Sequence, residues 1–148
     1  MLKAIVDTST YLDIRRATKN SRALWAQCTL KNLLAYRAVF PNLTISALKA
    51  YEILDGLYRG PALSAPHEFL VKVLPSYEVI YPDEQIIALG AEINAALASS
   101  RLTIGLADTM IAATAIARKL TLVNANSKHF FRVKAHGFPI TLENWRVD

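Results

Sequence analysis

Three carboxylates occupy places in the sequence where an unpaired charge would be costly. Asp7 follows the apolar run at residues 2–6, and Glu52 interrupts the apolar side of a helix-like stretch. Asp108 opens one of the most apolar helix-like runs, residues 107–117. A buried carboxylate without a partner is strongly destabilising, so such groups are usually paired or bound to metal. If the three converge, they would form a divalent-cation site, because Mg²⁺ prefers oxygen ligands.

Each carboxylate also has an ordinary structural interpretation. Asp7, which precedes Thr-Ser-Thr, could form an Asx turn or cap the helix that follows. Glu52 could pair with Lys49, three residues earlier, on a solvated helix face. Asp108 lies near the start of its helix and could act as the N-cap. Considered together, the three placements favour a shared site over three separate structural roles.

Size and composition indicate one globular domain. The chain has 148 residues, of which 53% are hydrophobic, and this is enough to bury a core without disulfides. No apolar stretch has the length of a membrane span, and the N-terminus lacks a signal-peptide pattern. The single cysteine, Cys28, excludes an internal disulfide and is typical of a reducing compartment. We therefore expect one domain, residues 1–148, in the cytoplasm and without membrane association.

The charge balance favours a polyanionic partner. The sequence has 17 Lys and Arg against 12 Asp and Glu, a net charge of +5. Such a surplus favours nucleic acid or an acidic protein segment as partner. The three histidines lack the spacing of zinc ligands, and no Gly-rich loop of the phosphate-binding type is present. A zinc site and a nucleotide-dependent kinase or ATPase are therefore not expected.

Short apolar segments alternate along the chain with segments of helical period. The predicted strands are residues 2–6, 43–45, 78–81 and 121–123, with an edge strand at 138–142. The predicted helices are residues 21–40, 47–58, 64–73, 83–98, 107–118 and 127–133. Ser46 is the expected N-cap of the second helix. The alternation predicts an α/β fold, a doubly wound, mainly parallel sheet of four to five strands with helices on both faces.

A sheet of this kind would bring polar candidates to one edge. Ligands bind outside the carboxyl ends of parallel strands. Asp7 directly follows the first predicted strand, and Asn126 comes shortly after the fourth. Glu52 and Asp108 lie on predicted helices. At least two of the candidates are thus expected at the edge where a ligand would bind.

Four segments resemble, in order, the motifs of the PIN-domain family. Residues 5–9 resemble its opening strand with the first acidic residue, and residues 46–56 resemble its second motif around Glu52. Residues 107–115 are similar to the third motif, in which an Asp heads an Ile-Ala-Ala-Thr-Ala helix, and residues 121–130 resemble the fourth. The closing residues 142–145 resemble the tail of VapC-type toxins in this family. The matches are well spaced and extend over the whole chain.

The resemblance implies a PIN-like fold and a Mg²⁺- or Mn²⁺-dependent endoribonuclease acting on RNA. Members are commonly the toxins of type II toxin–antitoxin pairs, so it also implies a small antitoxin protein as partner and a homodimer. The three acidic positions of the family correspond to Asp7, Glu52 and Asp108. The fourth position corresponds to Asn126, and Asn124 stands where the family often has Thr or Ser.

The resemblance also implies separate roles for these side chains. Asp7 and Asp108 would hold the metal, directly or through water. Glu52 would complete the cluster or orient the attacking water. Asn126 would hydrogen-bond a water or the phosphate, and its role should be weaker than that of an Asp because an amide carries no charge.

Two other functions compete with a toxin. One is a housekeeping RNA-processing nuclease that has no antitoxin. The other is a catalytically silent domain of the same fold that binds RNA or protein, an interpretation favoured by Asn124 and Asn126. A phosphatase using Asp7 as nucleophile would need a second Asp two residues later, where the sequence has Ser9.

Overall fold

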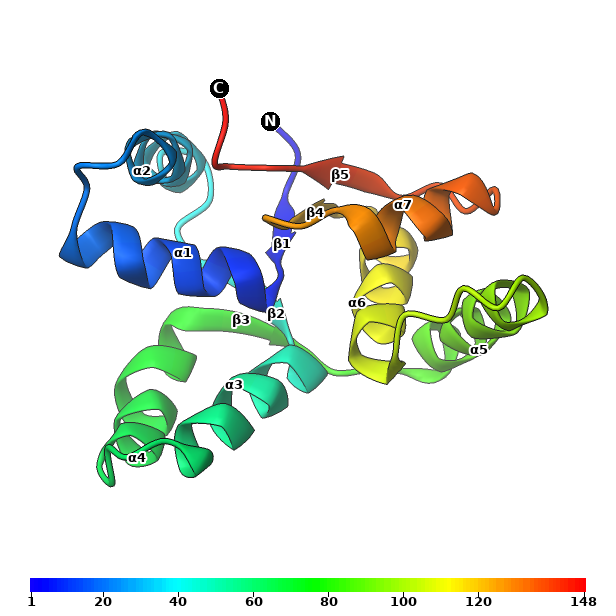
Figure 1. Cartoon of the computed structure of the whole chain (residues 1–148), viewed down its shortest axis with the longest axis horizontal. Coiled ribbons are helices and arrows are strands. Elements are labelled where there is room, and N and C mark those ends of the chain that lie inside the picture. The colour runs from blue at the N-terminus through cyan, green and yellow to red at the C-terminus, as the bar shows by residue number, and fades with distance from the viewer.

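Five parallel β-strands form one sheet in the computed structural model, which describes residues 1–148 (Figure 1). They are β1 (Ala4–Val6), β2 (Leu43–Ser46), β3 (Tyr77–Ile80), β4 (Thr121–Val123) and β5 (Thr141–Glu143). Their order across the sheet is β3-β2-β1-β4-β5, so the chain fills one side of β1 before it returns to fill the other. A reversal of this kind creates a crevice outside the carboxyl ends of the strands, here those of β1 and β4.

The central strands are apolar because both of their faces are covered. Every residue of β1 and β4 is buried. Ile5 is paired with Leu122 across the two strands, and both side chains enter the core on one face. Val6 and Val123 are paired in the same register and enter the core on the opposite face. This two-residue alternation lets one strand serve both layers.

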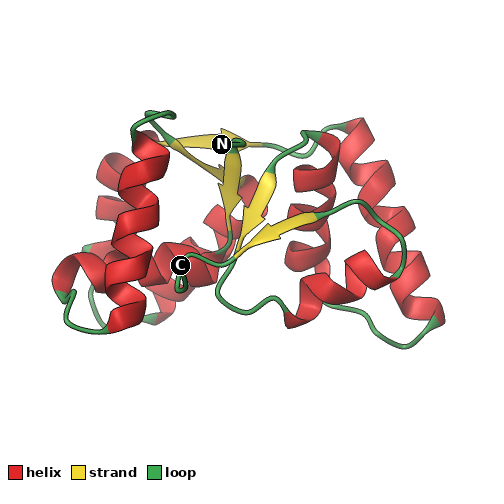
Figure 2. Cartoon of the chain, turned by 90° about the horizontal axis from the view of Figure 1, so that it is seen from above, coloured by secondary structure: helices red, strands yellow, loops and turns green.

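Helices cover both faces of the sheet (Figure 2). They are α1 (Thr8–Lys19), α2 (Leu24–Arg37), α3 (Ala47–Arg59), α4 (Ala65–Glu68), α5 (Glu84–Ser99), α6 (Leu106–Ala117) and α7 (Lys128–Ala135), with a π-helical turn η1 (Phe69–Val73) and a 3-10 turn η2 (Leu74–Ser76) before β3. Residues of α5, α6 and α7 pack around Ile5 and Leu122. Residues of α1, α2 and α3 pack around Val6 and Ile45. None of the helices combines the length and apolarity that crossing a membrane requires.

The predicted α/β class and the parallel sheet with helices on both faces are confirmed. Three local predictions need correction. Helix α1 was not predicted, because polar Thr10 and Asp13 are among the buried positions of its inward face. The predicted helix at 64–73 is not regular, since α4 ends at Glu68 and the chain continues as η1. The edge strand also begins later than predicted, at Thr141.

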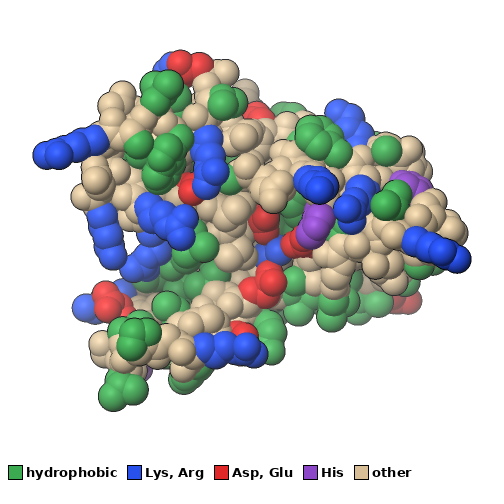
Figure 3. Space-filling view, in the orientation of Figure 1, with side chains coloured by type: hydrophobic (Ala, Val, Ile, Leu, Met, Phe, Trp, Pro, Cys, Tyr) green, Lys and Arg blue, Asp and Glu red, His purple; other side chains and the backbone are tan.

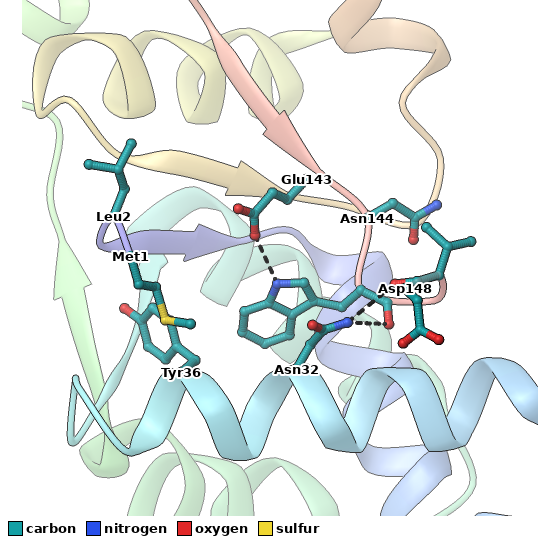
Figure 4. Close-up of a pocket in the computed structure, with 9 residues that line it drawn as sticks. Met1, Leu2, Asn32, Tyr36, Glu143, Asn144 and Asp148 are labelled. Atoms are coloured by element: carbon teal, nitrogen blue, oxygen red, sulfur yellow. Dashed lines mark hydrogen bonds between the residues drawn. The ribbon is translucent and has the colours of Figure 1, made fainter.

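The C-terminal segment is tied to α2, as Figure 4 shows. Trp145 is buried beside Tyr36, with 5.7 Å between the ring centroids, and its indole N–H donates to Glu143 at 3.1 Å. The side-chain amide of Asn32 donates to the carbonyls of Trp145 and Val147, at 3.2 and 3.3 Å. The pocket between this segment and α2 shares no residue with the three candidate acids. We therefore assign the tail a structural role.

Ser46 joins β2 to α3, and its predicted capping role is confirmed. Its Oγ accepts a hydrogen bond from the backbone N–H of Lys49 at 3.2 Å. Ser46→Ala should therefore lower the free energy of unfolding by about 1 kcal/mol, measured by urea denaturation. Ser99→Ala, at the exposed C-terminal end of α5, is a matched control and should cost less. An equal loss in the two variants would contradict the capping role.

Candidate metal centre

Asp7 is placed at the reversal of strand order. It directly follows β1, and its backbone N–H donates to the carbonyl of Val123 at the end of β4, at 2.9 Å. It occupies the N-cap position of α1, but its side chain makes no capping hydrogen bond. The carboxylate is 8% exposed, and its Oδ1 accepts no hydrogen bond. The capping interpretation of Asp7 therefore does not account for its side chain.

Glu52 and Lys49 come from one face of α3, where residues three apart are neighbours. The ion pair between Lys49 Nζ and Glu52 Oε1 is 2.9 Å long, so the pairing considered from the sequence does form. It does not lie on a solvated face, because Lys49 is only 3% exposed. Glu52 is the most accessible of the three acids, with 41% of its side chain exposed.

Asp108 lies in the first turn of α6, where the positive end of the helix dipole favours a carboxylate. The N-cap of this helix is Gly105, at φ +90°, and Asp108 makes no cap bond. The N-cap interpretation is therefore wrong. The left-handed backbone at Gly105 suits glycine, because a Cβ would be strained there. This turn directs the start of α6 toward α3, and the two helices pack together.

The three carboxylates meet at the ammonium group of Lys49. Its Nζ lies 3.1 Å from Asp7 Oδ1, forms the 2.9 Å pair with Glu52, and contacts Asp108 Oδ1. Figure 3 shows acidic side chains gathered near the middle of one face, with a histidine beside them and Lys and Arg around them. The predicted convergence of Asp7, Glu52 and Asp108 is thus present, with a cation at its focus that was not predicted.

The cluster keeps Lys49 protonated. Burial by itself would lower the pKa of Lys49, but the charge of Asp7 and the contacts with Asp108 and Glu52 outweigh it. The pKa is therefore raised above its ordinary value. Three carboxylates and one ammonium leave the cluster with two negative charges. That remaining charge would attract a divalent cation.

His129 is the second unpredicted member of the site. Its Nδ1 lies 2.7 Å from Asp108 Oδ2, and a carboxylate oxygen only accepts, so the ring nitrogen donates. The side chain is half-exposed at the start of α7, where it orients Asp108. Its place beside the fourth PIN-like motif was the only signal that pointed to the site.

The two asparagines after β4 differ in burial and in hydrogen bonding. Asn126 is exposed, and its Oδ1 accepts a local hydrogen bond from the backbone N–H of Lys128 at 3.4 Å. Asn124 is fully buried, and its side-chain Nδ2 has no hydrogen-bond partner, while its Oδ1 accepts from Ser127 at 2.9 Å. A contact between Asn126 and the three acids is absent, so its role in binding stays a prediction.

The donor set fits a hard divalent cation in chemistry. It consists of carboxylate oxygens, the ligands that Mg²⁺ and Mn²⁺ prefer, and the buried Asp7 Oδ1 has no hydrogen bond, only the ion pair with Lys49. As the side chains stand, no three of them are positioned to hold an ion together. Lys49 Nζ lies where they converge. The residues present therefore fit the ion, provided that the ammonium group of Lys49 moves away from some of the carboxylate oxygens.

Comparison with known proteins assigns this α/β domain to a family. The sequence matches the PIN domain family over residues 4–136. The chain therefore belongs to the PIN domain family. No protein of curated function matches the sequence significantly.

Solved structures of similar chains have the same fold over nearly their whole length. A chain of the DNA-bound VapBC of Salmonella typhimurium is 25% identical, with TM-score 0.74, over 98% of this chain and 99% of that chain. A chain of VapBC2 from Rickettsia felis, bound to a promoter DNA fragment, is 24% identical, with TM-score 0.76, over 97% and 99%. A chain of FitAcB from Neisseria gonorrhoeae is 22% identical, with TM-score 0.74, over 96% and 97%.

Proposed function

We propose that this protein is a Mg²⁺- or Mn²⁺-dependent endoribonuclease and the toxin of a type II toxin–antitoxin pair. The observation that carries the proposal is the meeting of Asp7, Glu52 and Asp108 at one point of a PIN domain. These acids come from three separate segments, and mutual repulsion makes their convergence costly unless cations compensate it. A purely structural role for these residues would not require three carboxylates at the carboxyl edge of the sheet.

Asp7 and Asp108 would hold the ion, and Glu52 would complete the cluster. When bound, such an ion supplies Lewis-acid stabilisation of the charge that develops on the phosphoryl oxygens. Glu52 is exposed enough to accept a proton from an attacking water, whereas Asp7 is buried. His129 holds Asp108 through Nδ1 and leaves its other ring nitrogen free of contacts within the protein. Asn126, on the exposed loop after β4, would hydrogen-bond the phosphate.

RNA as the substrate agrees with the distribution of charge. The protein carries a net charge of +5, although its candidate centre is acidic. Lys and Arg side chains surround the acidic side chains on the face shown in Figure 3. A basic rim would hold the phosphate backbone, and an acidic centre would hold the ion at the scissile bond.

An antitoxin partner is supported by the similar solved chains and by an apolar groove near the site. Those chains come from complexes named VapBC, VapBC2 and FitAcB, and a further similar chain comes from a toxin–antitoxin complex of Klebsiella pneumoniae. The groove lies between α3, η1, η2 and β3, and its lining is wholly hydrophobic: Ala47, Ala50, Tyr51, Leu54, Phe69, Leu74, Val79 and Tyr81. Tyr51 and Tyr81 are exposed there, and Tyr51 directly precedes Glu52 on α3. A small antitoxin that covers this groove would also reach the acids.

Three further properties complete the proposal. We propose a homodimer, for which the apolar pocket between α5 and α6, with Ile87 and Leu106 exposed at it, is a candidate surface. We also propose that residues 1–148 act as one domain. The buried free thiol of Cys28 is consistent with activity in the reducing cytoplasm.

The experiment that tests the proposal is cleavage of total cellular RNA by the purified protein. We expect discrete fragments with Mg²⁺ or Mn²⁺ and none with EDTA. Asp7→Asn removes one of the three charges and should abolish the fragments. Cleavage that persists in EDTA or in Asp7→Asn would contradict the proposed centre.

A catalytically silent PIN domain that binds RNA or protein is the second candidate. Two observations favour it, the ammonium of Lys49 among the acids and the absence of an acidic residue at position 126. RNA binding without cleavage by folded protein, shown to be free of any bound antitoxin, would support this alternative.

A further inference from the structure

We propose that Lys49 is an internal competitor of the divalent cation and sets how tightly the centre binds it. This inference rests on the proposed metal-dependent function and deepens it. A nuclease centre needs acids to attract its ion, but three adjacent acids destabilise the protein when the ion is absent. The positive charge of Lys49 offsets the repulsion between the acids when the ion is absent. The same charge weakens the attraction of the acids for the ion.

The contacts of Lys49 are with the oxygens that an ion would need. Its ammonium group contacts one oxygen of each acid: Oδ1 of Asp7, Oε1 of Glu52 and Oδ1 of Asp108. The other oxygen of Asp108 is held by His129. Both oxygens of Asp108 are therefore engaged. An ion that binds Asp108 must share an oxygen with Lys49 or His129 or displace one of them, and sharing with Lys49 places two cations side by side.

Of the two groups that contact Asp108, Lys49 is the one that an incoming ion would displace. Asp7 Oδ2 faces the hydroxyl of Ser9 at 3.5 Å, so this oxygen is only weakly engaged. An ion shared by all three acids nevertheless has to lie near their common point. Lys49 Nζ occupies that point. His129, by contrast, contacts Asp108 alone.

Lys49 differs from the surface lysines and arginines that pair with acids. Arg59 pairs with Asp55 one turn away on α3, with 79% of the Arg59 side chain exposed. Lys49 is buried at the base of the cluster and has three carboxylate partners. Charges separated from water interact more strongly than exposed ones. Its effect on an incoming cation should therefore exceed that of any surface lysine.

The test is calorimetric titration of the full-length protein with Mn²⁺. Lys49→Met keeps the aliphatic stem and removes the charge. We expect it to bind Mn²⁺ at least about tenfold more tightly than the parent, because a unit charge within about 4 Å of a divalent ion repels it even in a high-dielectric setting. Lys31→Met removes the same charge from a surface pair with Asp148 and should leave the affinity unchanged. Equal or weaker binding by Lys49→Met would overturn the proposal.

Thermal unfolding provides a second readout and guards against a folding defect. Without metal, Lys49→Met should melt below the parent, because three carboxylates then lack their internal cation. Saturating Mn²⁺ should raise its melting temperature by more than it raises that of the parent. Lys49→Gln, which is shorter and also uncharged, should behave in the same way. A smaller rise in both variants than in the parent would overturn the proposal.

The competitor proposal and the nuclease proposal can fail independently, because Mn²⁺ affinity and RNA cleavage are measured separately. Parent protein that cleaves RNA with Mn²⁺, beside a Lys49→Met variant with unchanged Mn²⁺ affinity, would remove the competitor role and leave the nuclease in place. Tighter Mn²⁺ binding by Lys49→Met, beside a parent that cleaves no RNA, would support the competitor role and contradict the nuclease.

Discussion

Asp108→Asn should reduce the rate of RNA cleavage by at least about a hundredfold, as expected when a group that stabilises charge in the transition state is lost. The substitution keeps the size of the side chain and removes its charge. Asp108 is the best-connected acid of the centre, since one oxygen contacts Lys49 and the other accepts from His129 at 2.7 Å. Its loss therefore weakens the attraction for a divalent ion and also releases two neighbours.

A matched control distinguishes this effect from a change in overall charge. Asp55 is on α3, one turn beyond Glu52, and pairs with Arg59 at 3.1 Å outside the cluster. Asp55→Asn should cleave RNA at the rate of the parent. Initial rates at saturating Mg²⁺, with circular dichroism to verify folding, would provide the measurement. Equal rates for Asp108→Asn and the parent would remove Asp108 from the mechanism.

Arg146→Ala should cause a large loss of stability. Asp13 on α1 is only 2% exposed, and Arg146 in the C-terminal segment donates to both of its oxygens, at 2.6 and 2.8 Å. The guanidinium also lies over the ring of Trp25, 5.6 Å from its centroid. Its removal leaves a buried carboxylate without a partner, which we expect to cost about 2 to 3 kcal/mol. This is less than for a fully buried pair, because 41% of the Arg146 side chain is exposed.

Differential scanning calorimetry at neutral pH would measure this loss. For a domain of this size, it corresponds to a fall in melting temperature of about 5 to 10 °C. Arg59→Ala removes an exposed pair within one helix and should cost less than about 0.5 kcal/mol. Equal effects of the two substitutions would show that the pair between Asp13 and Arg146 is no stronger than a surface contact.

Much of the fold could be predicted from local patterns. The buried strand before Asp7, the cap at Ser46 and the apolar helix after Gly105 all depend on neighbouring residues, so their signals are present in short windows of sequence. Helix α1 escaped prediction because its inward face carries Thr10 and Asp13. These residues are buried through partners distant in sequence, Val123 and Arg146, which no local window contains.

The candidate site, like the fold, was predicted only in part from the sequence. The acids were found from the sequence because each is a charge in an apolar context, and their order matches the PIN motifs. The place of Lys49 was not found, because its spacing from Glu52 also suits a solvated ion pair. Only the packing of α3 against α6 buries it among three acids. The role of Asn126 stays a prediction, since the structure places it on an exposed loop.

The sequence by itself determined the strands, most of the helices and the order of these elements, and it singled out the three acids. Only the tertiary structure decided that the ammonium of Lys49 is the point where these acids meet, and that His129 holds one of them. The physical reason is the separation along the chain of the residues that interact. Helical and strand periods reflect contacts between residues close in the chain, whereas the charge balance of the centre depends on segments about 60 and 100 residues apart, brought together by the crossovers of the sheet.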